Sequence, residues 1–238
     1  MRRYFFLIVI FFTIFFRSGP SGICAGSCEP VSYRIIEKDT LNENQILYNG
    51  RVWRNLYYMV KEDQFLFSHE FLPCSVTING ETFNNIGIRY DIFSDEIMTS
   101  VNNGSILQLN KEMVDSFTIF FQNKSYRFAK AQEDSLKSFK GYANVLVTGK
   151  ISLFVKYKKE IANLAVDNKY DLFFLTQRIY LVKDGVPYLI SGKREFFNHL
   201  DDYKVQIKSY IKKNRLKISK KNPESFVPVV QFYNSLRQ

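Results

Sequence analysis

The sequence predicts a mainly β protein of the α+β class, with an antiparallel meander sheet of about ten short strands and two C-terminal helices. Two segments of alternating polarity flank Asn79-Gly80. This pair is a strong hairpin signal because both central residues of a type I′ turn need positive φ. The chain is also rich in rings that suit half-buried pleated sheet, with 23 Phe and 15 Tyr. After Gly192 the apolar spacing changes from period two to the helical period.

The region before this central hairpin is expected to contribute short strands. A second Asn-Gly pair, Asn49-Gly50, separates residues 46–48 from residues 51–53 and predicts a first hairpin there. Pro73 interrupts the apolar pattern just before the central hairpin. The other short strands expected in this region are 56–60 and 64–67.

The strand after the central hairpin alternates in polarity. Its apolar positions are Ile86, Ile88, Tyr90 and Ile92, and its intervening positions are Gly87, Arg89 and Asp91. This alternation predicts one buried face and one wet face. Further hairpins are expected around 102–104 and 122–125. Pro187 cannot donate to a ladder, so the last strand, 186–190, is expected at an edge of the sheet. The pattern leaves open whether this curved sheet stays open or closes as a barrel.

The C-terminal region, 193–238, is expected to form two helices. The first follows the helical spacing of Phe196, Leu200, Ile207 and Ile211, with Asn214 as its stop. The second is expected to begin near Ser225. Pro228 then falls within its first turn, where the missing N–H costs little. The sheet and the helices together are expected to form a single domain over residues 46–238.

The N-terminal residues 1–27 are predicted to be a signal peptide. Arg2 and Arg3 precede an uncharged apolar run over 4–16. That run would span only about 20 Å as a helix, less than the roughly 30 Å of a bilayer core. Small residues follow, as at a cleavage site. We therefore expect an exported protein, periplasmic or outer-membrane-associated, with no transmembrane span in the mature chain. Residues 28–45 are expected to be a polar entry segment.

Two of the three cysteines, Cys28 and Cys74, are expected to remain in the mature chain. Residues 25–28 loosely resemble a bacterial lipobox, in which the cysteine becomes the lipidated first residue. In an oxidising compartment the two cysteines could instead pair as a disulfide. Both alternatives stay open, because a sequence does not give the distance between two Cα atoms.

The positive charge is concentrated in the C-terminal half. Residues 28–136 carry 10 basic and 15 acidic groups, a net charge of −5, whereas residues 137–238 carry 20 and 8, a net charge of +12. Seven cations follow one another without an acid: Lys208, Lys212, Lys213, Arg215, Lys217, Lys220 and Lys221. They form either a solvated face or a surface for an anionic envelope component or an envelope protein. Tyr210, the one aromatic residue in this run, falls on the buried stripe, which disfavours nucleic acid.

Chemistry-bearing residues are sparse. His69 and His199 are each isolated from a second metal-ligand candidate, and no glycine-rich phosphate loop is present, so no metal or other cofactor is expected. The best carboxylate cluster is Asp91, Asp95 and Glu96. Paired carboxylates can act as acid and base, although an ion pair between Arg89 and Asp91 is the simpler use. No catalytic residue is therefore assigned.

Several short motifs resemble those of a family of exported proteins from Bacteroidota. They are Tyr48-Asn-Gly-Arg51, Gly80-x-x-Phe83-x-Asn85, Arg89-Tyr-Asp-Ile-x-x-Asp-Glu96, a Lys-Glu-x-Val-x-x-Phe match within 109–117, Gly141-Tyr142 with 148–150, Lys193-Arg194, Tyr210-Ile-Lys-x-Asn-x-Leu216 and Tyr233-x-x-Leu236. They cover nearly all of the chain from about residue 46 onward. The resemblance implies an envelope location and a single domain, and it carries over no activity, cofactor or site.

The function expected from these observations is a non-enzymatic binding or structural protein of the cell envelope. Two alternatives compete with it. The first is a carrier of a lipid or other apolar ligand inside the sheet, which the aromatic strands could line. The second is a hydrolase of envelope glycans, which would need Asp91, Asp95 and Glu96 to converge in one cleft.

Overall fold

The computed structural model describes residue 47 and residues 49–236, except 102–103, 131–139 and 163–169. The chain divides into two compact units, residues 1–30 and 31–238, and every described residue belongs to the second. The expected signal peptide, the entry segment at 28–45 and Cys28 lie outside the described residues.

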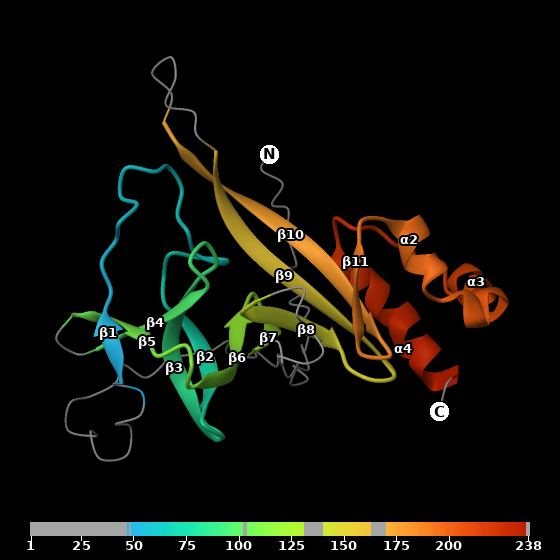
Figure 1. Ribbon diagram of the computed structural model, residues 1–238, viewed down its shortest axis with the longest axis horizontal. Coiled ribbons are helices and arrows are strands. Elements are labelled where there is room, and N and C mark those ends of the chain that lie inside the picture. Colours follow the sequence, from blue (N-terminus) through green and yellow to red (C-terminus); the bar gives the residue numbers. More distant parts are fainter. Residues whose placement is uncertain (1–46, 48, 102–103, 131–139, 163–169, 237–238) are drawn as a thin grey trace, which may run out of the picture. The chain divides into compact units, whose positions relative to one another are not determined.

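The described residues form an antiparallel sheet of eleven strands, followed by helices (Figure 1). The strands are β1 (Gly50–Val52), β2 (Leu72–Ile78), β3 (Glu81–Asp91), β4 (Glu96–Ser100), β5 (Ile106–Leu109), β6 (Val114–Phe121), β7 (Lys124–Lys130), β8 (Tyr142–Val147), β9 (Ile151–Ala162), β10 (Leu172–Lys183) and β11 (Val186–Ile190). Their order in the sheet is β1-β5-β4-β3-β2-β6-β7-β8-β9-β10-β11. β1 and β11 end this order without pairing to each other, so the sheet is open and the barrel alternative is wrong.

The central hairpin is confirmed. β2 and β3 meet at Asn79-Gly80, where φ is +50° and +82°, as a type I′ turn requires. The sheet departs from purely sequential hairpins next to this turn, because β6 pairs with β2 rather than with β5. Two hydrogen bonds hold the start of β6 there. The Asn79 N–H donates to the Met113 carbonyl (3.0 Å), and the Gly80 N–H donates to Asp115 Oδ2 (2.8 Å).

The expected first hairpin at Asn49-Gly50 is wrong. Gly50 begins β1, which pairs with β5 far along the chain, with Gly50 opposite Leu109. A Cβ on Gly50 would lie 2.2 Å from the Gln108 carbonyl oxygen. Glycine therefore serves close backbone approach here and not a turn. Two other expectations fail. Residues 56–60 and 64–67 form no strands, although Lys61 and Phe65 make isolated bridges. Pro73 does not interrupt the strand pattern, because it lies inside β2.

The strand and edge expectations for the C-terminal part of the sheet hold in outline. β11 is an edge strand and contains Pro187, which pairs with Val182. Residues 172–183 form one long strand, β10. β10 pairs with β9 over its whole length, from Leu172 opposite Ala162 to Lys183 opposite Ile151.

Two apolar cores hold the sheet. The first is built on β2–β8 and is rich in rings. Tyr90 lies 5.1 Å from Phe117, 5.3 Å from Phe128 and 6.2 Å from Tyr142, measured between ring centroids. The second core joins β8–β11 to the helices. At its centre, Phe196, Phe226 and Tyr233 have no exposed surface.

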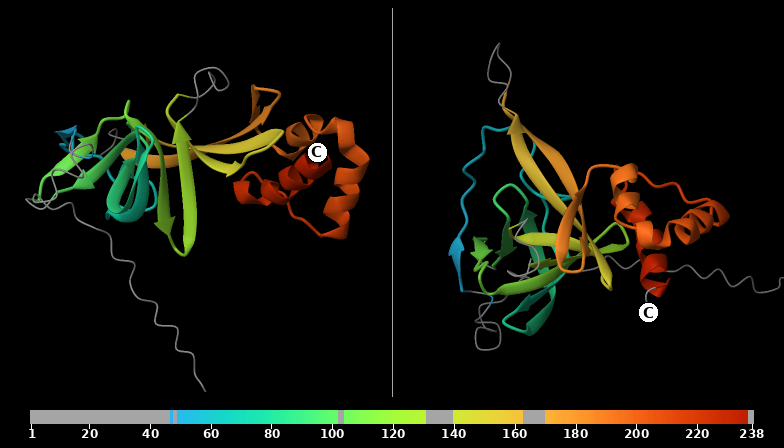
Figure 2. Two further views of the ribbon diagram at one scale, coloured as in Figure 1. Left: turned by 90° about the horizontal axis from the view of Figure 1, so that it is seen from below. Right: turned by 45° about the vertical axis from the view of Figure 1, so that its right-hand side comes forward.

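The C-terminal region forms three α-helices rather than two. They are α2 (Lys193–Asn198), α3 (Lys204–Lys213) and α4 (Val227–Leu236), with 3₁₀ turns η3 (Asp201–Tyr203) and η4 (Pro223–Phe226). Figure 2 shows the helices grouped at the β9–β11 end of the sheet. The first expected helix is interrupted at His199, whose carbonyl accepts a hydrogen bond from Lys183 Nζ (3.0 Å) instead of continuing a helical ladder. No helix within the described ranges is long and apolar enough to cross a membrane.

Candidate functional site

The three carboxylates singled out in the sequence do not converge. Asp91 and Glu96 are partners across β3 and β4, so their side chains leave the same face of the sheet. Asp95 occupies the turn between these strands with a φ of +60°. Its carboxylate accepts hydrogen bonds from Tyr90 Oη (2.5 Å), Lys111 Nζ (2.8 Å) and Lys156 Nζ (3.0 Å). Asp95 thus joins the aromatic core and not the face shared by Asp91 and Glu96.

Asp91 is 2 % exposed, and its Oδ1 accepts the backbone N–H groups of Phe93 (2.8 Å) and Ser94 (2.9 Å). These two hydrogen bonds shape the β3–β4 turn. Burial raises the pKa of the Asp91 carboxyl above its ordinary value, although the two N–H groups oppose this shift. One oxygen of Asp91 is therefore committed to the turn.

Arg89, expected to pair with Asp91, lies between two rings. Its guanidinium carbon is 4.7 Å from the centroid of Phe65 and 4.3 Å from that of Phe71. Stacking of this kind stabilises a partly buried guanidinium. Arg89 therefore helps to cover the face of β3 that Asp91 occupies.

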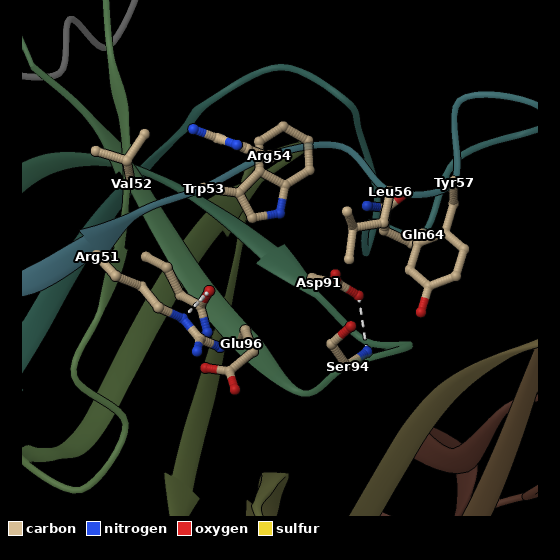
Figure 3. Close-up of a pocket in the computed structure, with 11 residues that line it drawn as sticks. Arg51, Val52, Trp53, Arg54, Leu56, Tyr57, Gln64, Asp91, Ser94 and Glu96 are labelled. Atoms are coloured by element: carbon tan, nitrogen blue, oxygen red, sulfur yellow. Dashed lines mark hydrogen bonds between the residues drawn. The ribbon is translucent and has the colours of Figure 1, made fainter.

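A cavity of about 360 Å³ lies over Asp91 and Glu96, and we call it the Arg51 cleft (Figure 3). Its lining comes from β1, β3, β4 and β5, from the β3–β4 turn and from the chain segment between β1 and β2. The lining residues are Arg51, Val52, Trp53, Arg54, Leu56, Tyr57, Gln64, Asp91, Ser94, Glu96 and Gln108. This volume lies within the range of about 300–1,000 Å³ that is typical of small-molecule sites.

The polar groups of the cleft are held by few protein contacts. Arg51 Nε donates to Gln108 Oε1 (2.9 Å), which joins β1 to β5 across the cleft floor. Gln64 is only 3 % exposed, yet within the described part of the chain its side-chain amide makes no hydrogen bond. The backbone carbonyl of Gln64, in contrast, accepts a hydrogen bond from the Ile92 N–H (3.1 Å).

Contacts with other aromatic rings hold the aromatic residues that line the cleft. The Trp53 ring lies 6.0 Å from Phe65, and Tyr57 makes edge contacts with Phe93 at 4.9 Å and Phe173 at 5.8 Å. The backbone of this segment is also tied, because the Trp53 N–H donates to the Ile106 carbonyl (2.8 Å).

The seven cations of 208–221 form a second feature, which we call the basic surface. Its members are Lys208, Lys212, Lys213, Arg215, Lys217, Lys220 and Lys221, and all are exposed. Within the described ranges none of them forms an ion pair. Tyr210 stacks on Phe232 of α4, with 4.1 Å between ring centroids, so its ring is used in packing.

The remaining predicted residues lie apart from both features. Cys74 is fully buried in β2, where its thiol donates to the Ser75 carbonyl (3.3 Å), and burial raises its pKa. The exposed His69 contacts Glu70, and His199 packs on Tyr188. Among the residues that the structure describes, no group of three or more His, Cys, Asp or Glu side chains could hold a metal ion.

No protein-family model, curated protein or solved structure matches this chain. The resemblance to exported proteins of Bacteroidota therefore stays a prediction.

Sequence reasoning missed the Arg51 cleft. Strands are predicted at 51–53 and 56–60, although the sequence Arg-Val-Trp-Arg-Asn-Leu-Tyr over 51–57 combines cations and rings in a way that few core strands do. This mixture of cations and rings was the sequence signal that could have indicated a binding surface here. Gln64 offered none, because the burial of an amide depends on which segments cover it.

Proposed function

We propose that this chain is an exported, non-enzymatic envelope protein whose basic surface binds a lipid surface that carries phosphate groups. One observation supports this most directly. All seven cations of the basic surface are exposed, and within the described residues no carboxylate pairs with them. An unneutralised cluster of one sign attracts anionic surfaces.

The arrangement of α3 supports the same partner. Ile207 is buried and Ile211 is partly buried, so this side of the helix packs inward. Val205, Lys208 and Lys212 are exposed on the other side, at spacings of three and four residues. Val205 is 78 % exposed, so the cationic face also presents an apolar side chain. A helix with this pattern suits the interface of a bilayer with anionic headgroups.

The expected strength follows from membrane electrostatics. Each Lys or Arg near an anionic leaflet contributes about 1 kcal/mol, and salt screens this attraction over a Debye length of roughly 8–10 Å. Seven cations that reach the surface only in part would therefore give reversible binding that weakens with added salt. A single point of attachment at Cys28, if lipidated, would add to it.

The two alternative functions receive less support. A carrier would need space inside the sheet, but the rings of Tyr90, Phe117 and Phe128 pack on one another at 4.9–5.3 Å between centroids. A hydrolase was expected to bring Asp95 together with Asp91 and Glu96. Only the latter two line the Arg51 cleft, and one oxygen of Asp91 serves the turn.

Vesicle co-sedimentation tests the proposal. Wild type should bind phosphatidylglycerol vesicles at low salt and should not bind neutral phosphatidylcholine vesicles. Lys208→Gln, Lys212→Gln, Lys213→Gln and Lys217→Gln, combined in one variant, should remove most of this binding. The matched control changes four exposed cations elsewhere: Arg127→Gln, Lys140→Gln, Lys150→Gln and Arg178→Gln.

The outcomes separate a surface from net charge alone. Retained binding by the control supports the basic surface, whereas equal losses in both variants would mean that only overall charge matters. Failure of wild type to sediment with phosphatidylglycerol contradicts the proposal. Competition by millimolar inorganic phosphate would point to free phosphate instead of a lipid surface.

The export component has a separate test. Mass spectrometry of the mature N-terminus should find cleavage close to Cys28. A diacylglyceryl modification on Cys28 means an anchored protein, and an unmodified terminus near this residue means a released one. An intact Met1 in cells would show that the signal-peptide prediction is wrong.

A further inference from the structure

We propose that the Arg51 cleft is a second binding site, which takes a neutral, hydroxyl-rich small molecule of the monosaccharide type. The site lies on the β1 and β3–β5 part of the sheet, whereas the basic surface lies in the helical region. Its residues and its ligand class differ from those of the proposed lipid-binding function, so each site can be tested alone.

Gln64 is the first residue that points to this ligand class. A nearly buried amide that makes no hydrogen bond to protein groups can bond to water or to a ligand instead. Gln64 is 3 % exposed and lines the cleft, and its side-chain amide makes no hydrogen bond within the described residues, so the small surface that it keeps is open to a ligand. A group in the cleft that both donates and accepts would satisfy it, and a hydroxyl does both.

The second step is the charge balance of the lining. Two arginines, Arg51 and Arg54, face two carboxylates, Asp91 and Glu96, so the formal charges cancel. Within the described ranges neither Arg54 nor Glu96 forms an ion pair or a side-chain hydrogen bond. The cleft therefore offers strong donors and strong acceptors together and attracts neither sign of ligand charge. Vicinal hydroxyls match such a mixture, because each can donate to a carboxylate and accept from a guanidinium.

The third step is the apolar wall. Figure 3 shows Trp53, Leu56 and Tyr57 along the segment that covers the cleft, with Asp91 and Glu96 on the strands beneath. The rings of Trp53 and Tyr57 are held by Phe65, Phe93 and Phe173, so little rotamer freedom is lost when a ligand contacts them. A pyranose ring has C–H faces for such a wall and hydroxyl edges for the polar floor.

The size of the cleft agrees with this class. About 360 Å³ is at the lower end of small-molecule sites, which suits one sugar ring and its water better than a polymer. Ser94 and Arg51 are exposed at the opening of the cleft. The terminal sugar of a longer glycan could therefore also enter it.

Ligand-observed NMR with the mature protein tests the proposal. The probes are N-acetyl-D-glucosamine and D-glucose as neutral sugars, glucose 6-phosphate as an anion, and L-glutamine as a zwitterion. At least one neutral sugar should bind with a millimolar or lower Kd. Arg54→Gln and Glu96→Gln should each weaken it by about tenfold, the equivalent of one charged hydrogen bond.

Gln64→Leu should weaken binding at least as much, because it removes the amide that the ligand satisfies. Arg54 is exposed and Glu96 is partly exposed, so their variants carry the test if Gln64→Leu lowers the unfolding temperature too far. Matched controls outside the cleft are Arg127→Gln, Glu81→Gln and Gln206→Leu, all at exposed positions, which should bind as wild type. Each variant should also keep wild-type vesicle binding, which separates this site from the lipid-binding proposal.

Two results would overturn the inference. In the first, neither neutral sugar binds at millimolar concentration, whether or not glucose 6-phosphate or glutamine binds. In the second, the sugars bind equally well to wild type and to the Arg54 and Glu96 variants. The last result would mean that they bind somewhere else on the protein.

Discussion

Asn234 of α4 bonds to the backbone of Ile151, the first residue of β9, in the way that a neighbouring strand would. Its Oδ1 accepts the Ile151 N–H (2.9 Å) and its Nδ2 donates to the Ile151 carbonyl (2.9 Å). A Cβ on Gly149 would lie 2.4 Å from the same Nδ2, so the β8–β9 turn leaves room for this amide. One side chain thus joins the C-terminal helix to the β9–β10 hairpin.

Asn234→Ala should lower the free energy of unfolding by about 1–3 kcal/mol, because the variant removes two hydrogen bonds and leaves both backbone groups of Ile151 to find other partners. Urea unfolding followed by circular dichroism measures the change. The matched control is Asn198→Ala, at the exposed end of α2, which should change the midpoint little. Equal losses in both variants would show that Asn234 is not a special contact.

Asp95→Asn should also destabilise the fold, by about 2–4 kcal/mol, because it removes the negative partner of Lys111 and Lys156. Burial already lowers the pKa of Lys156, and the Asp95 charge opposes that shift, so the variant should lower this pKa further. Asparagine tolerates the positive φ at this position, so backbone strain should not contribute.

Chemical denaturation measures this effect, with Glu112→Gln as control, since that carboxylate lies 3.8 Å from Lys130 and is largely exposed. The sugar probes should still bind Asp95→Asn, because Asp95 does not line the Arg51 cleft. Loss of sugar binding in a folded Asp95 variant would contradict the separation of the three carboxylates.

Local signals predicted the hairpins well, and the pairing of distant strands poorly. Asn79-Gly80 determines its own turn, since the positive φ values that it needs are a property of those two residues. Asn49-Gly50 is the same dipeptide, but it lies where β1 pairs with β5. A glycine is needed there because the backbone of Gln108 comes too close for a Cβ. Neither the pairing of β6 with β2 nor that of β1 with β5 has a local signal, because side chains far apart in sequence decide both.

The candidate sites also differ in whether local sequence predicts them. The basic surface could be recognised from sequence because exposure of consecutive cations follows from the cost of burying charge. The separation of Asp95 from Asp91 and Glu96 depends on the positive φ of Asp95 in the β3–β4 turn, and the burial of Gln64 depends on the segment that covers it. The helical break at His199 likewise depends on Lys183, sixteen residues earlier.

Gly50→Ala should loosen β1 and the floor of the Arg51 cleft. The added Cβ would lie 2.2 Å from the Gln108 carbonyl oxygen, so β1 must move away from β5. Amide hydrogen exchange should become at least about tenfold faster at Trp53, whose N–H now bonds to the Ile106 carbonyl. Gly192→Ala is the control, because nothing lies within 4 Å of its added Cβ. Unchanged exchange at Trp53 would contradict this role for Gly50.

Asp202 should make the fold sensitive to acid between about pH 4 and pH 2. Hydrogen bonds from Lys183 Nζ (3.0 Å) and Tyr233 Oη (2.9 Å) lower its pKa from 3.8 to about 2. The unfolded chain therefore binds this proton first, and the stabilisation is complete above pH 3.8 and lost as the pH falls through 2.

Asp202→Asn should thus be less stable than wild type at pH 6, and this difference should shrink towards pH 2. The neighbouring Asp201→Asn, whose carboxylate pairs with the exposed Lys204, is the control for thermal unfolding across this range. A difference between wild type and Asp202→Asn that stays constant from pH 6 to pH 2 would show that the Lys183–Asp202–Tyr233 contacts do not depend on the charge of this carboxylate.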